Sequence, residues 1–95
     1  MITHIVTFSW IAGVTDDQVS ALGRALDELA AYRSDIVTVR HGRDLRFRDG
    51  NGDYALVATF ADRAGWDDYQ ADPAHKAFVR DHVTPIQASR IAIQF

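Results

Sequence analysis

The residues best suited to chemistry lie in the segment YQADPAHKAF, which contains Tyr69, Asp72 and His75. An Asp directly before Pro73 is typical of a helix N-cap followed by proline at the first helical position. His75 is therefore expected in the first turn of a helix, where it is either half exposed and chemically idle or, facing a pocket, a general base. The helix dipole lowers the His75 pKa and Asp72 raises it, each by less than about one unit, so the sign of the net shift stays open.

A second candidate is His4, which lies on the bulky face of the first β-rich segment. A histidine in such a place is most often a hydrogen-bonded core residue, and its burial requires a partner. We expect Tyr54, Tyr69 or His75 to supply that partner. If these side chains converge, His75 is a general base and Tyr69 or Tyr54 a donor that stabilises an enolate or oxyanion. His4 then orients the reacting group, as proton abstraction beside a carbonyl requires.

Aromatic side chains are expected to form the rest of a small apolar pocket around these groups. The predicted ligand-binding residues are Phe8, Tyr54, Trp66 and Phe78, with a core position beneath the second helical region as the alternative for Trp66. His75 and His82 are seven residues apart and share a helix face, but two histidines without a third ligand are weak evidence for a metal. Neither a metal nor a cofactor is therefore expected.

Length and composition limit the classes of protein that need to be considered. The chain has 95 residues, 47% of them hydrophobic and 24% charged, which indicates one ordered domain over residues 1–95. With no cysteine, disulfides, thiolate catalysis and iron–sulfur clusters are excluded. No apolar run reaches the roughly 18 residues of a membrane span and the N-terminus lacks a signal-peptide pattern, so a cytoplasmic protein is expected.

The pattern of apolar residues predicts the order of the secondary-structure elements. Period-two alternation predicts a strand over 2–9, and the Thr15 to Gln18 capping box predicts a helix that runs to about Tyr32. Further strands are expected over 35–41, 54–60 and 90–95, and helices after Asp62 and after Asp72, the last ending before Pro85. The order β-α-β-β-α-β predicts an α+β fold, the ferredoxin-like sandwich with helices on one side of a four-stranded sheet.

The two faces of this predicted sheet differ in composition. Large side chains, including those of His4, Phe8 and Phe60, fall on one face, which should pack against the helices. The other face carries compact, uncharged residues, which suits packing of one sheet on another. We therefore expect a homodimer that buries on the order of 800 Å² per subunit.

Charged and nucleic-acid partners are not favoured by the sequence. The net charge is -3, whereas binding to a phosphate backbone usually needs a concentrated positive surface. The RNA-recognition motif shares this strand order but displays aromatic residues on its open face, and here the aromatics fall on the helix side. Arg43, Arg46 and Arg48 lie in a predicted hairpin loop with Phe47 and could hold an acidic ligand. A solvated loop neutralised by Asp44, Asp49 and Asp53 is the alternative.

Several segments resemble one family. His4-Ile5-Val6 followed by Phe8, the segment Tyr54 to Phe60, and Tyr69-x-x-Asp-Pro-Ala-His75-x-x-Phe78 are similar to the stress-responsive dimeric α/β-barrel (Dabb) domain. The resemblance covers nearly the whole chain, and the Asp-Pro-x-His element is its most specific part. It implies a dimer in which two ferredoxin-like subunits pack sheet to sheet, and it does not imply one activity.

One member with known chemistry is the plant olivetolic acid cyclase, a cofactor-free enzyme that performs an intramolecular aldol condensation of a polyketide. The resemblance aligns three of its pocket residues with His4, Tyr69 and His75. Two others are histidines in that enzyme and correspond to Tyr54 and Asp72 here, which departs from the cyclase pattern. Some relatives in the wider barrel group bind haem through a histidine. The alternative to a protein without a cofactor is therefore a haem-binding protein, which would be coloured.

Two classes of function follow from the sequence. The first is a cofactor-independent enzyme that uses His75 and a tyrosine for acid/base work on a small, largely apolar carbonyl compound. The second is a small-molecule-binding or stress-associated homodimer without catalysis. A cavity of about 300 Å³ or more with converging polar side chains favours the first class, and a filled core favours the second.

Overall fold

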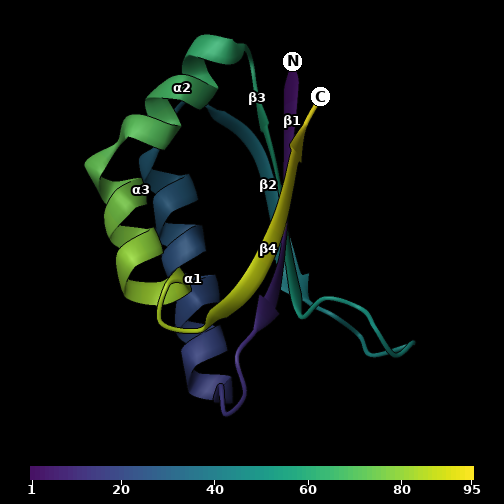
Figure 1. The fold of residues 1–95 in the computed structure, drawn as a ribbon. Helices are drawn as coiled ribbons and strands as arrows, with labels where there is room; N and C mark the ends of the chain where they lie inside the picture. The colour runs from purple at the N-terminus through teal and green to yellow at the C-terminus, as the bar shows by residue number, and fades with distance from the viewer.

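The chain folds into a four-stranded sheet covered by one layer of helices (Figure 1). The computed structural model describes all 95 residues. The elements are β1 (Ile2–Trp10), α1 (Asp16–Tyr32), β2 (Ile36–Arg43), β3 (Tyr54–Phe60), α2 (Arg63–Ala71), α3 (Pro73–Phe78), the π-helical turn η1 (Val79–Val83) and β4 (Gln87–Gln94). The sheet order is β2-β3-β1-β4, with every neighbouring pair antiparallel. This confirms the predicted ferredoxin-like α+β fold.

The first helix begins and ends where the sequence predicts. Thr15 Oγ1 accepts a hydrogen bond from the Gln18 backbone N–H at 3.2 Å, and Gln18 Oε1 accepts one from the Thr15 N–H at 2.9 Å. This capping box satisfies two backbone donors that the helix leaves free. One apolar stripe of α1 is buried against the sheet: Val19, Leu22, Leu26 and Leu29.

The second helical region is divided at Asp72, also as predicted. Asp72 ends α2, and its Oδ1 accepts a hydrogen bond from the Ala74 N–H at 2.6 Å to cap α3, with Pro73 in the first turn. The unpredicted feature is η1, in which the Thr84 N–H donates to the Val79 carbonyl at 2.8 Å. This wider turn directs Val83 into the core, where it is buried, and such turns are frequent at functional sites.

Two strands are longer than the alternation predicts. β2 continues through Gly42, which pairs with Ala55, and β4 begins at Gln87, which pairs with Trp10. Neither added segment has a strong β preference. The reason is that an existing neighbour offers backbone hydrogen bonds regardless of side chain, so pairing overrides the local propensity.

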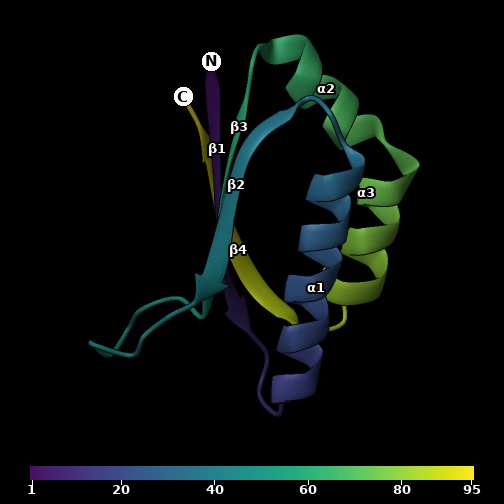
Figure 2. The same ribbon diagram turned by 180° about the vertical axis from the view of Figure 1, so that it is seen from behind.

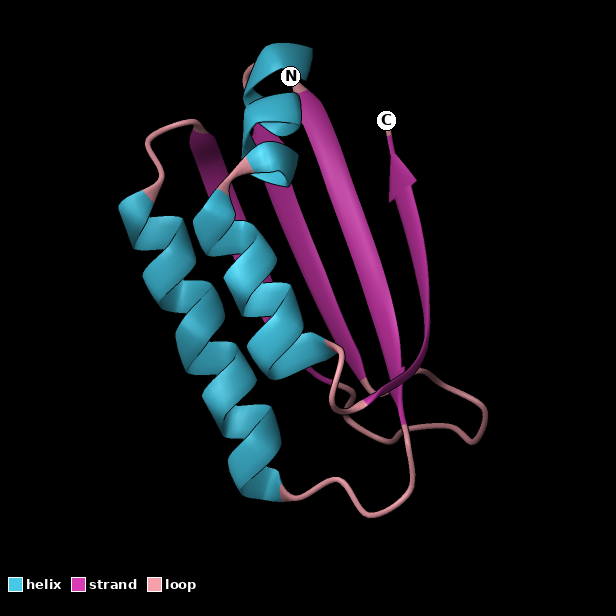
Figure 3. Cartoon of the chain, turned by 60° about the vertical axis from the view of Figure 1, so that its left-hand side comes forward, coloured by secondary structure: helices cyan, strands magenta, loops and turns pink.

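The helices cover one face of the sheet and leave the other bare (Figures 1, 2 and 3). The bulky residues of β1 and β3 are buried beneath the helices, as predicted: His4, Val6, Phe8, Tyr54, Leu56, Ala58 and Phe60. On the opposite, open face Ile5 pairs with Val57 and Ile93, and Thr7 pairs with Ile91. Ile91 is 74% exposed and Ile93 58% exposed. The open face is therefore a largely apolar surface that no helix of its own chain covers.

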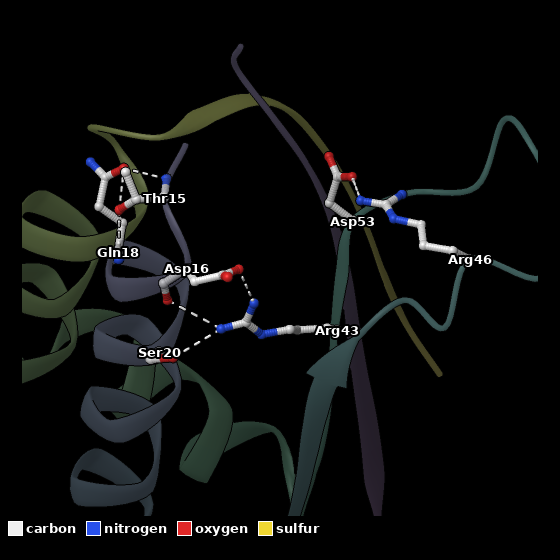
Figure 4. Close-up of polar contacts among 7 residues, drawn as sticks. All are labelled: Thr15, Asp16, Gln18, Ser20, Arg43, Arg46 and Asp53. Carbon is white, nitrogen blue, oxygen red and sulfur yellow. Dashed lines mark hydrogen bonds and ion pairs between the residues drawn. The ribbon is translucent and has the colours of Figure 1, made fainter. Parts of the chain in front are cut away.

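The loop between β2 and β3 extends away from the helices, past the open face (Figures 1 and 2). Ion pairs engage Arg43, at the end of β2, and Arg46, within the loop (Figure 4). Arg43 donates to Asp16 Oδ1 at 2.8 Å and to Ser20 Oγ at 2.9 Å, and Arg46 pairs with Asp53. These pairs favour the interpretation of a solvated, internally neutralised loop over a docking site for an acid.

In addition, none of the helices has the length and apolar character needed to cross a membrane.

Candidate functional site

A cavity of about 480 Å³ lies between the helix-facing side of β1 and β4 and the helical segment α3-η1. Its apolar walls are Val6, Phe8, Leu56, Phe78, Val79 and Val83. Its polar lining includes His4, Tyr69, His75, Gln87 and Arg90. The fold thus leaves a cavity where the three predicted catalytic residues, His4, Tyr69 and His75, come together.

His4 is buried in the wall of this cavity and is held by two donors. Its Nδ1 accepts hydrogen bonds from Trp66 Nε1–H at 3.3 Å and from the Gln94 side-chain amide at 3.0 Å. Because an indole nitrogen only donates, Nδ1 must carry a lone pair, and the proton of the neutral ring is on Nε2. Burial lowers the pKa of His4, and the proximity of His75 and of the Arg90 charge lowers it further. His4 therefore offers a neutral Nε2–H that has no partner within the protein.

The prediction for the partner of His4 was wrong. Tyr54, Tyr69 and His75 do not bond to it; Gln94 and Trp66 do. Gln94 is the cross-strand neighbour of His4 in the β1–β4 ladder, and Trp66 is contributed by α2. His4 is far from both partners along the chain, and only the strand register and the position of α2 bring them together. The periodicity of a short segment therefore could not predict this contact.

Tyr69 lies between the two histidines. Its ring centroid is 6.4 Å from that of His4 and 4.2 Å from that of His75. Burial raises the pKa of Tyr69 to about 12, against a smaller lowering by the charge of Arg33. The phenol is therefore protonated throughout the neutral range, and its hydroxyl makes no hydrogen bond inside the protein, so it remains available to donate to a ligand.

His75 occupies the third position of α3, as predicted, and its Nδ1 is buried without a well-formed hydrogen bond. Burial lowers the pKa of His75 more than the Gln70 carbonyl and Asp72 raise it. The sign that the sequence left open is thus decided by desolvation, and the imidazole is neutral near pH 7. Because Nδ1 is buried, Nε2 is the ring nitrogen left to accept a proton from a ligand, the chemistry of a general base.

Arg33 fixes the junction between α2 and α3 that carries these residues. Its guanidinium pairs with Asp35 and with Asp72, the cap of α3, and lies 6.0 Å from the centre of the Tyr69 ring. The Arg33 side chain is only 11% exposed. Asp72, which departs from the cyclase pattern, therefore has a structural role here, as cap and as ion-pair partner.

Replacing Arg33 with methionine is expected to lower the free energy of unfolding by about 1–3 kcal/mol, because two poorly solvated carboxylates, Asp35 and Asp72, lose their charged donor. Urea unfolding of parent and variant measures this. Arg63→Met is the matched control: its pair with Asp67 is well exposed and should contribute about 0.5 kcal/mol or less. Equal losses in both variants would contradict the assigned role of Arg33.

Two of the predicted pocket residues lie elsewhere. Tyr54 does not line this cavity; its hydroxyl is 2.6 Å from His41 Nδ1, and His41 Nε2 is 2.6 Å from Asp27 Oδ1. Trp66 does not line the cavity either; it donates a hydrogen bond to His4, which does. Phe8 and Phe78 line the cavity as predicted. The His41 interaction was missed because it joins β2 to α1, although the alternation of β2 does place His41 on the helix side.

Arg90 is a further residue of the site that the sequence did not predict. It lies on β4 opposite Phe8 and reaches the cavity edge. The signal was present in the alternation of Arg90, Ala92 and Gln94, which puts all three on the helix-facing side, but nothing local indicated that this side of β4 is left uncovered by a helix.

The sheet, the one-sided helical layer and the pocket with two histidines and a tyrosine define a ferredoxin-like α+β protein. The chain belongs to the family described as Stress responsive A/B Barrel Domain (Dabb), whose sequence pattern matches residues 2–95. This confirms the family inferred from the sequence. No curated protein matches the chain in sequence.

Solved structures agree with this assignment. A dimeric ferredoxin-like protein of unknown function from Thermobifida fusca is 37% identical, with a TM-score of 0.91 over 99% of this chain and 88% of that one. A Dabb family protein from Mesorhizobium loti is 21% identical, with a TM-score of 0.81 over 99% and 93%. A hydroxynitrile lyase from Passiflora edulis is 16% identical, with a TM-score of 0.87 over 99% and 90%. The last two likenesses concern the fold.

Proposed function

We propose that this protein is a cofactor-independent acid/base enzyme that acts on a small, largely apolar carbonyl compound. The observation that carries the proposal is the convergence of His4, Tyr69 and His75 on one cavity of about 480 Å³. This volume lies within the range of small-molecule sites, and mostly apolar walls with a few polar groups are typical of them.

The proposed reaction begins with the removal of a proton from the carbon beside the carbonyl. His75 Nε2 accepts that proton, and the electron pair of the broken C–H bond moves to the carbonyl oxygen to form an enolate. Tyr69 donates a hydrogen bond to this oxygen, and the Nε2–H of His4 orients it. The enolate carbon then either takes the proton back from His75 or attacks a second carbonyl carbon of the substrate. In the second case the electron pair of that carbonyl moves to its oxygen, which receives the proton held by His75, so His75 returns to its neutral form in both cases.

Additional support comes from the hydroxynitrile lyase among the structural neighbours. At 16% identity the likeness concerns the fold, so the lyase reaction itself is not transferred to this chain. It supports the narrower statement that this fold is compatible with lyase chemistry.

We further propose that the protein is a homodimer whose two subunits pack through their open sheet faces. Neighbours of the same fold are described as dimeric, and the exposed isoleucines Ile91 and Ile93 give this face the apolar character of an interface. A sheet packed on a sheet would remove this surface from water on both copies at once.

One observation favours the second candidate, a non-catalytic binding protein. A catalytic histidine is commonly oriented by a carboxylate or another strong acceptor, whereas His75 Nδ1 has no well-formed hydrogen bond. In that case the same cavity would hold a ligand without reaction.

The pH dependence of proton exchange separates the two candidates. We expect the protein to speed hydrogen–deuterium exchange beside the carbonyl in at least one of 2-octanone, octanal and 4-oxooctanoate, followed by NMR in D₂O. The exchange rate should rise with pH, with a midpoint below 6.5, because only the neutral imidazole accepts a proton. The value 6.5 is the ordinary pKa of histidine, from which burial lowers the pKa of His75. The rate should then stay level to about pH 9, since Tyr69 keeps its proton. Exchange no faster than in buffer would favour the binding protein.

A further inference from the structure

The charges around the cavity are all of one sign. Lys76, Arg80 and Arg90 line it, and no Asp or Glu does, although the chain contains 13 acidic and only 10 basic residues. Arg80 is neutralised by Asp81 at 2.8 Å. Lys76 and Arg90 form no ion pair within the chain. Cationic side chains in proteins usually pair with an anion. The protein itself supplies no anion to the unpaired cations at the edge of this apolar cavity.

Arg90 is the lining cation whose charge acts on both histidines of the cavity. The β1–β4 ladder places it opposite Phe8, on the side of β4 that faces the cavity. Its charge lowers the pKa of both His4 and His75, which requires the guanidinium to lie within electrostatic reach of both rings. Each imidazole is neutral, so neither competes with Arg90 for an anion.

We infer that the pocket binds an amphipathic carboxylate, with its acid group on Arg90 and its hydrocarbon part against Phe8, Phe78 and Val83. A planar guanidinium with free donors suits a carboxylate because both oxygens can be bound in parallel. This inference rests on the proposed function and narrows it. The substrate would be an oxo acid of moderate chain length, whose carboxylate is held on Arg90 while its carbonyl lies between Tyr69 and His75.

Octanoate and octanamide provide the test, because they share a chain and a shape and differ in charge. Because Arg90 lies exposed at the cavity edge, the protein should bind octanoate about 2- to 5-fold more tightly than octanamide in titrations followed by NMR and calorimetry, the range of one exposed charge pair. Arg90→Gln should remove this preference by weakening the binding of octanoate. Arg24→Gln is the matched control: it removes the same charge from an exposed residue of α1 outside the cavity, so the preference should persist.

A second readout is independent of affinity. Octanoate beside Arg90 should offset its charge and raise the pKa of His75 in an NMR titration, whereas octanamide should not. Equal binding of the two ligands, binding of neither, or a preference that survives Arg90→Gln would each overturn the inference. None of these results bears on proton exchange in neutral ketones, so the acid/base proposal stands or falls separately.

Discussion

In a variant with His75→Ala, exchange of protons beside the carbonyl is expected to fall by about 10²- to 10⁴-fold, the usual contribution of a positioned general base. The cavity would keep its walls, because His75 is only partly buried and its Nδ1 makes no hydrogen bond that the fold depends on. Octanamide should therefore still bind, and the loss should be in kcat rather than in KM.

His82 provides the control for this experiment. It follows His75 by seven residues, lies outside the cavity and is partly exposed. His82→Ala removes an imidazole of the same kind from the same helical region, and the exchange rate should stay within about twofold of the parent, since surface replacements away from a site have small effects. If His75→Ala and the parent exchange at the same rate while both remain folded, the general-base role is disproved.

Ile91→Lys is expected to convert the proposed dimer to a monomer. Ile91 is 74% exposed in the single chain and lies on the open face, beside Thr7 of β1. In a sheet-to-sheet dimer a lysine there, together with its copy, would put two like charges into an apolar interface, at a cost of several kcal/mol. A standard interface of about 800 Å² per subunit does not tolerate such a loss at micromolar concentration.

Sedimentation at micromolar concentration measures this result, with the parent expected as a dimer. Tyr32→Lys is the control, because Tyr32 is similarly exposed, at 70%, but lies at the end of α1 in the helical layer. The control should remain dimeric. A monomeric parent, or an Ile91→Lys variant that stays dimeric, would refute the proposed interface, while the pocket on the other side of the sheet would be unaffected.

β4 connects the two proposals in this molecule. Its alternation directs Ile91 and Ile93 to the open face and Arg90 to the cavity, so one edge strand contributes to both surfaces. Because β4 is held only by β1 within the subunit, a partner sheet against its open face would also steady the position of Arg90.

The local elements follow from the sequence alone. The Thr15 capping box, the proline after Asp72 and the period-two alternation in β1 and β3 each act over a few residues, and each predicted element is present. The assignment of faces follows for the same reason, because side chains alternate across a strand whatever its neighbours are. Short-range patterns of this kind are therefore sufficient to determine the fold class and to indicate the family.

The properties of the site depend on the tertiary structure. The tautomer of His4 depends on Trp66 and Gln94, 62 and 90 residues away along the chain. The direction in which the His75 pKa shifts depends on the burial of this side chain in the folded protein, and the presence of Arg90 at the cavity depends on strand register. Hydrogen-bond partners, desolvation and charge proximity arise from groups that only folding brings together, so no pattern of neighbouring residues could specify them.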